Sequence, residues 1–321
     1  MTATLTEALL PFIAKLPPLE SDEVLRRIKT TTGASLGSLR GALTEYKKAG
    51  VGEQSPSHSE IAAAVVESFG NGCLLFAASA FWAWRGRGVW DRLDSSEIRQ
   101  CIQRVLTKMM PRFTAHTVGS VAKILEGLVF EPRVEFESGP DAVNCLNGEL
   151  RLDDIGIWYL EPHKRKHYRT TQLPLEWDQK ATAPQFMQFL REVFAPDGDC
   201  EAKVLLVLEL IGYSCTTSTS FEKFIILVGR GANGKSVLLA ALTSLLGTSN
   251  VSAVQPVNFG SRFQLAHLEG KIANIVTELP EGKELPDDAI KSLVSGELVT
   301  AERKLQPPFD FHPFATIWAG T

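Results

Sequence analysis

The stretch Phe224-Ile-Ile-Leu-Val228, followed directly by Gly229-Arg-Gly-Ala-Asn-Gly234-Lys235-Ser236, decides the fold of the C-terminal third of this chain. It predicts a buried apolar strand that runs into a glycine-rich loop. Residues 237–246 then predict an amphipathic helix that ends at Gly247. The loop fits the pattern GxxxxGK[ST] between a strand and a helix, and in that context the pattern indicates a phosphate-binding loop rather than an ordinary turn.

The chemistry of such a loop explains its residue types. Glycines allow backbone N–H groups to curl around a triphosphate, and the helix N-terminus adds a partial positive charge. We expect Lys235 to reach the β- and γ-phosphates and the Ser236 hydroxyl to bind Mg²⁺. The chain is therefore predicted to bind a nucleoside triphosphate through eight consecutive residues: Gly229, Arg230, Gly231, Ala232, Asn233, Gly234, Lys235 and Ser236.

Two further apolar segments predict inner strands of the same sheet. Ile272–Val276 ends just before Glu278, and Phe314–Ala319 predicts a third core strand. An acid at the carboxyl end of an inner parallel strand is suited to orient Mg²⁺ and an attacking water. The alternative for Glu278 is a solvated acid at the end of a strand, and the nearby phosphate-binding loop favours the catalytic role.

Composition limits the class of protein. The 321 residues suggest two domains, and 44% hydrophobic with 22% charged residues is typical of a soluble globular protein. The net charge of −4 gives no overall attraction to nucleic acid, so any such surface must be local. Five widely spaced cysteines without CxxC favour reduced thiols, and no signal peptide or membrane span is found. A cytoplasmic location is expected.

The chain is predicted to be α/β, with a parallel-sheet core behind an α-rich domain. We assign residues 1–50 to a small helical module, 51–59 to a linker, 60–215 to the α-rich domain and 216–321 to the P-loop core. Within the α-rich domain, residues 142–160 predict a small β insert. Residues 204–211 are apolar nearly all round, which predicts a buried helix.

Several motifs, in this order, resemble the superfamily 3 helicase half of phage and plasmid primase–helicases. They are FIILVGRGANGKS, NFGSRFQLAHLEGKIANIVTELPEG, SGELVTAERK and FHPFATIWAGT, and LNGELRLDDIGIWYLEPH with YRTTQLPLEWD resembles the domain that precedes the ATPase. The resemblance covers about residues 60–321. It implies an AAA+-like core, ATP and Mg²⁺ as cofactors, single-stranded DNA as a partner, a hexameric homo-oligomeric ring, and a primase as a further partner.

The resemblance also implies roles for single residues. Lys235 and Ser236 match the phosphate and magnesium residues, and Glu278 matches the Walker B acid. Arg303 and Lys304 fall in the segment that forms a hairpin touching single-stranded DNA in the ring channel. From residue type alone, a solvated hairpin tip explains this pair equally well.

The sequence departs from the family at two places. Thr277 precedes Glu278 where many relatives have a second acid, and nothing after Phe314–Ala319 supplies the sensor Asn and arginine finger of the family. We expect that the C-terminal end of the core is missing, that hydrolysis is slow, and that the strand at 314–319 has an uncovered edge.

Other candidates are weaker. The cationic run at residues 161–169 is either a solvated loop or a track for a DNA backbone, and His163 with His167 lacks a third metal ligand. Trp82, Trp84 and Trp90 are expected to pack in a core. Two alternatives to a helicase stay open: a DNA-binding ring scaffold that binds ATP without turnover, and a P-loop NTPase unrelated to DNA, such as a small-molecule kinase.

Overall fold

The computed structural model describes residues 9–48, 56–110, 112–139, 141–229, 231 and 233–321. The chain divides into two compact units, one with Met1–Val65 and Ile98–Leu128, the other with Val66–Glu97 and Val129–Thr321. The four-part division expected from the sequence stays a prediction, and part of its linker lies outside the described residues. Within the described ranges, no helix combines the length and the hydropathy that a membrane crossing requires.

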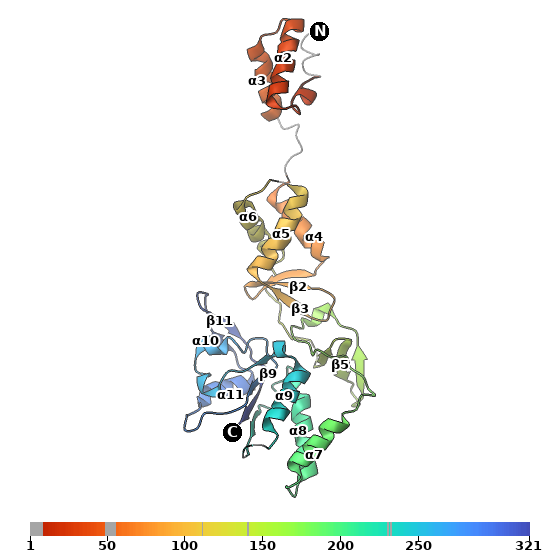
Figure 1. Cartoon of the computed structure of the whole chain (residues 1–321), viewed down its shortest axis with the longest axis vertical. Coiled ribbons are helices and arrows are strands. Elements are labelled where there is room, and N and C mark those ends of the chain that lie inside the picture. The colour runs from red at the N-terminus through yellow and green to blue at the C-terminus, as the bar shows by residue number, and fades with distance from the viewer. Residues whose placement is uncertain (1–8, 49–55, 111, 140, 230, 232) are drawn as a thin grey trace. The chain divides into compact units, whose positions relative to one another are not determined.

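The first unit is helical. Helices α2 (Pro18–Thr32) and α3 (Leu36–Lys48) are separated by Gly33, which adopts φ +74° and ends α2. They share one core with the short segment before them, formed by Leu10, Ile13, Leu25, Ile28, Leu39 and Leu43. Helices α4 (His58–Phe69), α5 (Ser95–Met109) and α6 (Ala115–Leu128) follow in the chain (Figure 1). Each of them buries one face, as the helical periodicity predicts.

The second unit contains a small antiparallel sheet that the sequence did not predict. It consists of β1 (Leu74–Ala77), β2 (Ala80–Trp84) and β3 (Trp90–Leu93). Its tryptophans pack in a core, as expected: Trp90 is buried, and the Trp82 ring lies 4.1 Å from the ring of Phe136. The strands are short and carry apolar residues on both faces, so they lack the alternation that identifies a strand.

A second antiparallel sheet confirms the small β insert. Its strands are β4 (Val143–Cys145), β5 (Gly148–Leu152) and β6 (Trp158–Glu161), paired in the order β4-β5-β6. The backbone approach at Gly148 requires glycine, because a Cβ there would lie 2.5 Å from the Glu161 carbonyl oxygen.

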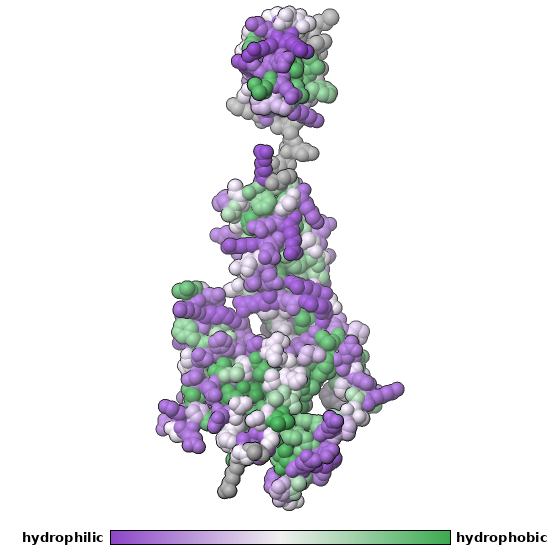
Figure 2. All heavy atoms as spheres, viewed as in Figure 1, coloured by the Kyte–Doolittle hydropathy of each residue, from purple (hydrophilic) through white to green (hydrophobic). Residues whose placement is uncertain are grey.

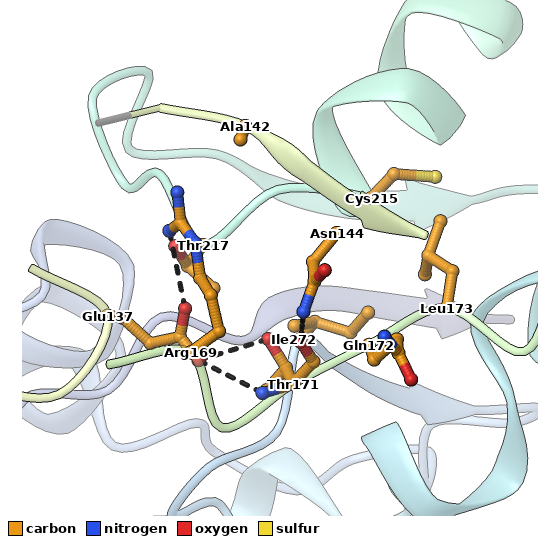
Figure 3. A pocket seen from close by; sticks show the side chains of 10 residues that line it. All are labelled: Glu137, Ala142, Asn144, Arg169, Thr171, Gln172, Leu173, Cys215, Thr217 and Ile272. Atoms are coloured by element: carbon orange, nitrogen blue, oxygen red, sulfur yellow. Dashed lines mark hydrogen bonds and ion pairs between the residues drawn. The ribbon is translucent and has the colours of Figure 1, made fainter. Parts of the chain in front are cut away.

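A buried ion cluster lies against β5. The Glu149 carboxylate is fully buried and accepts hydrogen bonds from His167 Nδ1 at 2.9 Å and from the Arg169 guanidinium at 3.1 Å. Arg169 also pairs with Glu137 at 3.4 Å, and Glu137 accepts the backbone N–H of Thr171 at 3.0 Å (Figure 3). Buried charges of this kind are stable only when paired and hydrogen-bonded.

The buried ion cluster includes part of the cationic run at residues 161–169. In addition to His167 and Arg169, two further basic side chains of the run have partners. Arg165 donates to the Asn71 carbonyl oxygen at 2.7 Å, and Lys164 pairs with Glu161. Four of its basic side chains are therefore bonded within the protein, and His167 and Arg169 are buried. Arg165 and Lys166 are exposed, so a contact of this run with DNA stays a prediction.

Helices α7 (Pro184–Phe194) and α8 (Cys200–Ser214) connect these sheets to the C-terminal core. The expectation of a fully buried helix at residues 204–211 is wrong. Val204 and Val207 are buried, whereas Leu205 and Leu206 are more than half exposed, because α8 packs through one side only.

The C-terminal core is a parallel sheet of four strands. In chain order these are β7 (Phe224–Leu227), β8 (Val251–Ser252), β9 (Ala273–Val276) and β12 (Thr316–Gly320), and in space the order is β7-β12-β9-β8. Helix α9 (Lys235–Leu246) covers one face through a cluster that includes Trp318. The other face, which carries Ile317, is covered by α10 (Arg262–Leu265) and α11 (Asp287–Ser295). This arrangement confirms the α/β class.

Two expectations about strand burial are wrong. The strand at 314–319 is not an uncovered edge, because β12 pairs with β7 on one side and β9 on the other, and its five residues are buried. Conversely, the strand before the glycine-rich loop is an edge strand. Ile226 is 46% exposed and Val228 is 80% exposed.

A hairpin packs on the α10 and α11 side of the sheet. It consists of β10 (Val299–Ala301) and β11 (Phe309–Phe311), and Ala301, Phe309 and Phe311 join the cluster around Ile317. The hairpin therefore lies on the face opposite α9.

The buried cluster leads to a stability prediction. We expect Arg169→Met to lower the free energy of unfolding by about 3–5 kcal/mol, since it leaves two buried carboxylates without their cation. Arg191→Met is the matched control, because Arg191 pairs with Glu201 at the surface and its loss is expected to cost about 0.2–1 kcal/mol. Urea unfolding followed by tryptophan fluorescence measures both. Equal effects would mean that the cluster adds no more than a surface pair.

Candidate functional site

The glycine-rich loop leads into the N-terminus of α9. Gly234 precedes the helix with φ +83°, in the left-handed region that favours glycine, and Lys235 is the first helical residue. Lys235 Nζ donates to the Gly229 carbonyl oxygen and, at 3.0 Å, to Asn233 Oδ1. Arg230 and Ala232 lie outside the described residues. The first N–H groups of α9 have no partner within the helix, so this end is suited to bind an anion.

The ends of three strands meet beside this loop. The N–H of Thr321 donates to the Leu227 carbonyl oxygen at 3.1 Å, and the N–H of Leu279 donates to the Gly320 carbonyl oxygen at 2.8 Å. A Cβ at Gly320 would lie 2.3 Å from the Thr277 carbonyl oxygen, so only glycine allows this approach. The loop after β7 and the Thr277-Glu278 pair after β9 therefore flank the end of β12, at the carboxyl ends of the parallel strands.

A pocket of about 330 Å³ opens at this end of the sheet, between α9 and strands β8 and β9. Ser236 and Thr277 both line it, so the structure brings the hydroxyl after Lys235 and the residue before Glu278 to one cavity. None of its lining residues is charged. They are Ser236, Leu239, Ala240, Thr243, Thr248, Val251, Ser252, Ala253, Ile275 and Thr277.

Glu278 itself is exposed, two residues beyond β9. Its backbone carbonyl accepts a hydrogen bond from Gln255 Nε2 at 3.3 Å, which fixes the chain but not the carboxylate. The hydroxyl of Ser236 and the carboxylate of Glu278 are oxygen donors, the ligand type that Mg²⁺ prefers. The donor set at this edge thus suits a magnesium-bound triphosphate.

Arg303 and Lys304 lie in the turn of the β10–β11 hairpin and differ in their surroundings. Arg303 pairs with Glu269, which also binds Arg92 at 3.3 Å, and its guanidinium lies 4.2 Å from the centre of the Phe309 ring. Lys304 is exposed. The two cations are therefore not equivalent, because the Arg303 side chain is paired and only 30% exposed, whereas Lys304 is exposed.

Three side chains of metal-ligand type also lie close together. Glu149, Glu161 and His167 have ligand atoms within 4.8 Å of one another. Burial raises the pKa of Glu161, but hydrogen bonds from Lys164 and Arg151 outweigh it and hold the pKa below its usual value. Because arginine, lysine and histidine donors already bind both carboxylates, ion pairing explains this group.

Some residues that contact the predicted site residues were not identified from the sequence. Glu269 has no motif of its own, and its pairing with Arg303 depends on a separation of 34 residues along the chain. Phe189 and Val193 of α7 approach Gly234, a contact between segments about 40 residues apart in the chain. No local pattern identifies contacts of this kind.

Comparison with known proteins bears on both halves of the chain. Residues 63–195 match the family described as "D5 N terminal like", and residues 227–321 match a "Family of unknown function (DUF5906)". The second match begins in β7 and includes the whole loop, Glu278 and the hairpin.

Solved structures with a similar fold include an apo structure of the NrS-1 C-terminal region. It has a TM-score of 0.52 at 13% identity and covers 83% of this chain and 57% of that chain. A further structure of that region, its A form without ligand, has a TM-score of 0.50 at 13% identity, with 77% and 53% covered. The present chain thus spans little more than half the length of these proteins. Together, the fold and the D5 N terminal like match support a relation to the phage and plasmid primase–helicases that the motifs resemble.

Proposed function

We propose that this chain is an ATP-dependent DNA helicase subunit of a phage- or plasmid-type replication system, which moves along single-stranded DNA. The observation that carries the proposal is that the Gly229–Ser236 loop and the Thr277-Glu278 pair lie at the same end of the sheet, beside one pocket. The spatial order β7-β12-β9-β8 further supports an AAA+-like core, with one strand between the loop strand and the acid strand. The D5 N terminal like match supports the replication context.

The residues at the edge have separate tasks in this proposal. Lys235 exchanges its bonds to Gly229 and Asn233 for the β- and γ-phosphates, and the Ser236 hydroxyl with Glu278 holds Mg²⁺. When bound, the metal neutralises charge on the transferring phosphoryl group. Glu278 orients the attacking water, and Thr277 provides a hydroxyl where relatives have a second acid. An exposed carboxylate near such a site is accessible to both water and metal.

The hairpin provides the DNA contact in this proposal. Lys304 is placed at the exposed turn, where a phosphate of single-stranded DNA is able to reach it. Arg303 instead holds the turn of the hairpin against Glu269 and Phe309. The proposed assembly is a homo-oligomeric ring, in which a primase is a further partner.

The role of Lys235 is tested by Lys235→Ala. We expect ATP affinity to fall about 100-fold, because a charged donor to the phosphates is lost while the core is untouched. Calorimetric titration with ATP and Mg²⁺ measures the affinity. Lys223→Ala is the control, since Lys223 is an exposed lysine just before β7 and should keep the parental affinity. Equal affinities for all three proteins would remove the phosphate-binding assignment.

Glu278→Gln should separate binding from turnover. The amide keeps the size of the side chain but cannot take up a proton or bind the metal as a charged ligand. We expect nucleotide affinity to persist and steady-state hydrolysis to fall by about 100-fold or more. Glu281→Gln changes an equally exposed acid three residues away and serves as the control. Parental turnover in Glu278→Gln would place the catalytic acid elsewhere.

The hairpin is tested by the salt dependence of binding to a single-stranded oligonucleotide, measured by fluorescence anisotropy. Lys304→Ala should reduce the log–log slope by about 0.7, the value for one phosphate contact on a single strand. Arg303→Ala should change the slope by much less, because Glu269 already neutralises that cation. The opposite ranking would show that DNA displaces Glu269 from Arg303.

A further inference from the structure

Helix α7 packs directly against the glycine-rich loop. A Cβ at Gly234 would lie 2.8 Å from Val193 Cγ2 and 3.2 Å from the Phe189 ring, so both side chains touch the loop at its last glycine. Leu190, between them on the same helix, is buried with Val204, Val207 and Leu238. This contact lies outside the GxxxxGK[ST] pattern, and α7 belongs to the same compact unit as the C-terminal core.

The first turn of α9 shows which end of a nucleotide would face α7. Ser236 lines the 330 Å³ pocket beside Thr277, whereas Leu238 packs on α7 and α8. Two residues apart on a helix means about 200° around its axis, so these two sides of α9 are opposite. If the magnesium-bound γ-end of a triphosphate lies at Ser236 and Thr277, its nucleoside extends beyond the pocket, and α7 is the element that borders the loop on the other side.

Apolar surface is available on that side. Val228 and Val237, on either side of the loop, are 80% and 58% exposed, and Phe189 is half-buried with one part of its ring against Gly234. Figure 2 shows hydrophobic residues at the surface in the region where Figure 1 places α8 and α9. Apolar and aromatic side chains next to a phosphate-binding loop suit a flat heterocyclic base.

We propose that α7 forms the nucleoside subsite of the ATP site, in which the Phe189 ring stacks on the base and Val193 and Val237 contact the sugar or base edge. The inference rests on the proposed function and extends it to a residue that contacts the base. It assigns base recognition to a helix that precedes β7 in the chain. Nucleotide binding would thereby fix α7 relative to the loop.

The experiment compares two probes, ATP and inorganic tripolyphosphate, each titrated with Mg²⁺ into the full chain. Tripolyphosphate occupies the phosphate positions but has no nucleoside. The variant Phe189→Leu keeps an apolar side chain against Gly234 and removes the ring. We expect it to weaken ATP binding about tenfold, in the range of one lost base–aromatic stack, and to leave tripolyphosphate binding within twofold of the parent. Phe189→Trp should retain ATP binding.

Phe186→Leu is the matched control. Phe186 lies on the same helix with its ring 6.1 Å from that of Phe189, and its substitution should affect neither probe. Equal weakening of both probes in Phe189→Leu would overturn the subsite, because the ring would then only support the loop. Unchanged binding of both would overturn it as well. A parent chain that binds neither probe would instead overturn the proposed function, and this inference with it.

Discussion

Strand β12 determines the geometry of the whole C-terminal core. It lies between β7 and β9 and pairs in parallel with each of them, and these two strands do not pair with each other. Its side chains also divide the core, since Trp318 faces α9 and Ile317 faces α10 and α11. The Trp318 indole donates to Ser214 Oγ at 2.9 Å and so connects this strand to α8. The spacing between the loop and Glu278 is therefore set by one intervening strand.

Two glycines allow the close approaches around this end of the sheet. Gly320 allows the backbone after β9 to approach β12 closely, and Gly234 allows the loop to pack under α7. A side chain at either position would displace the neighbouring backbone or side chains. Helix α7, although it precedes β7 in the chain, packs on the loop and lies in one compact unit with the sheet.

Much of the core was predictable because its signals are local. The loop and the helix after it follow from glycine positions and apolar periodicity, and the hairpin around Arg303 follows from the family resemblance. The burial of the strands was not predictable, since an apolar run before a loop is compatible with an edge strand as well as an inner one. The order of the strands in the sheet is a long-range property. The same holds for the partner of Arg303 and for the burial of His167 and Arg169.

The position of β12 has a consequence for the order of events during synthesis. The central strand of this sheet is the last of its four in the chain, so β7 and β9 have no neighbour to share until residues 316–320 have left the ribosome. Pairings over such long separations form slowly, and unpaired strand edges associate readily before they close. Until then the loop strand has no partner in this sheet. The loop after β7 and the residues after β9 thus come to lie side by side only when β12 is inserted between their strands.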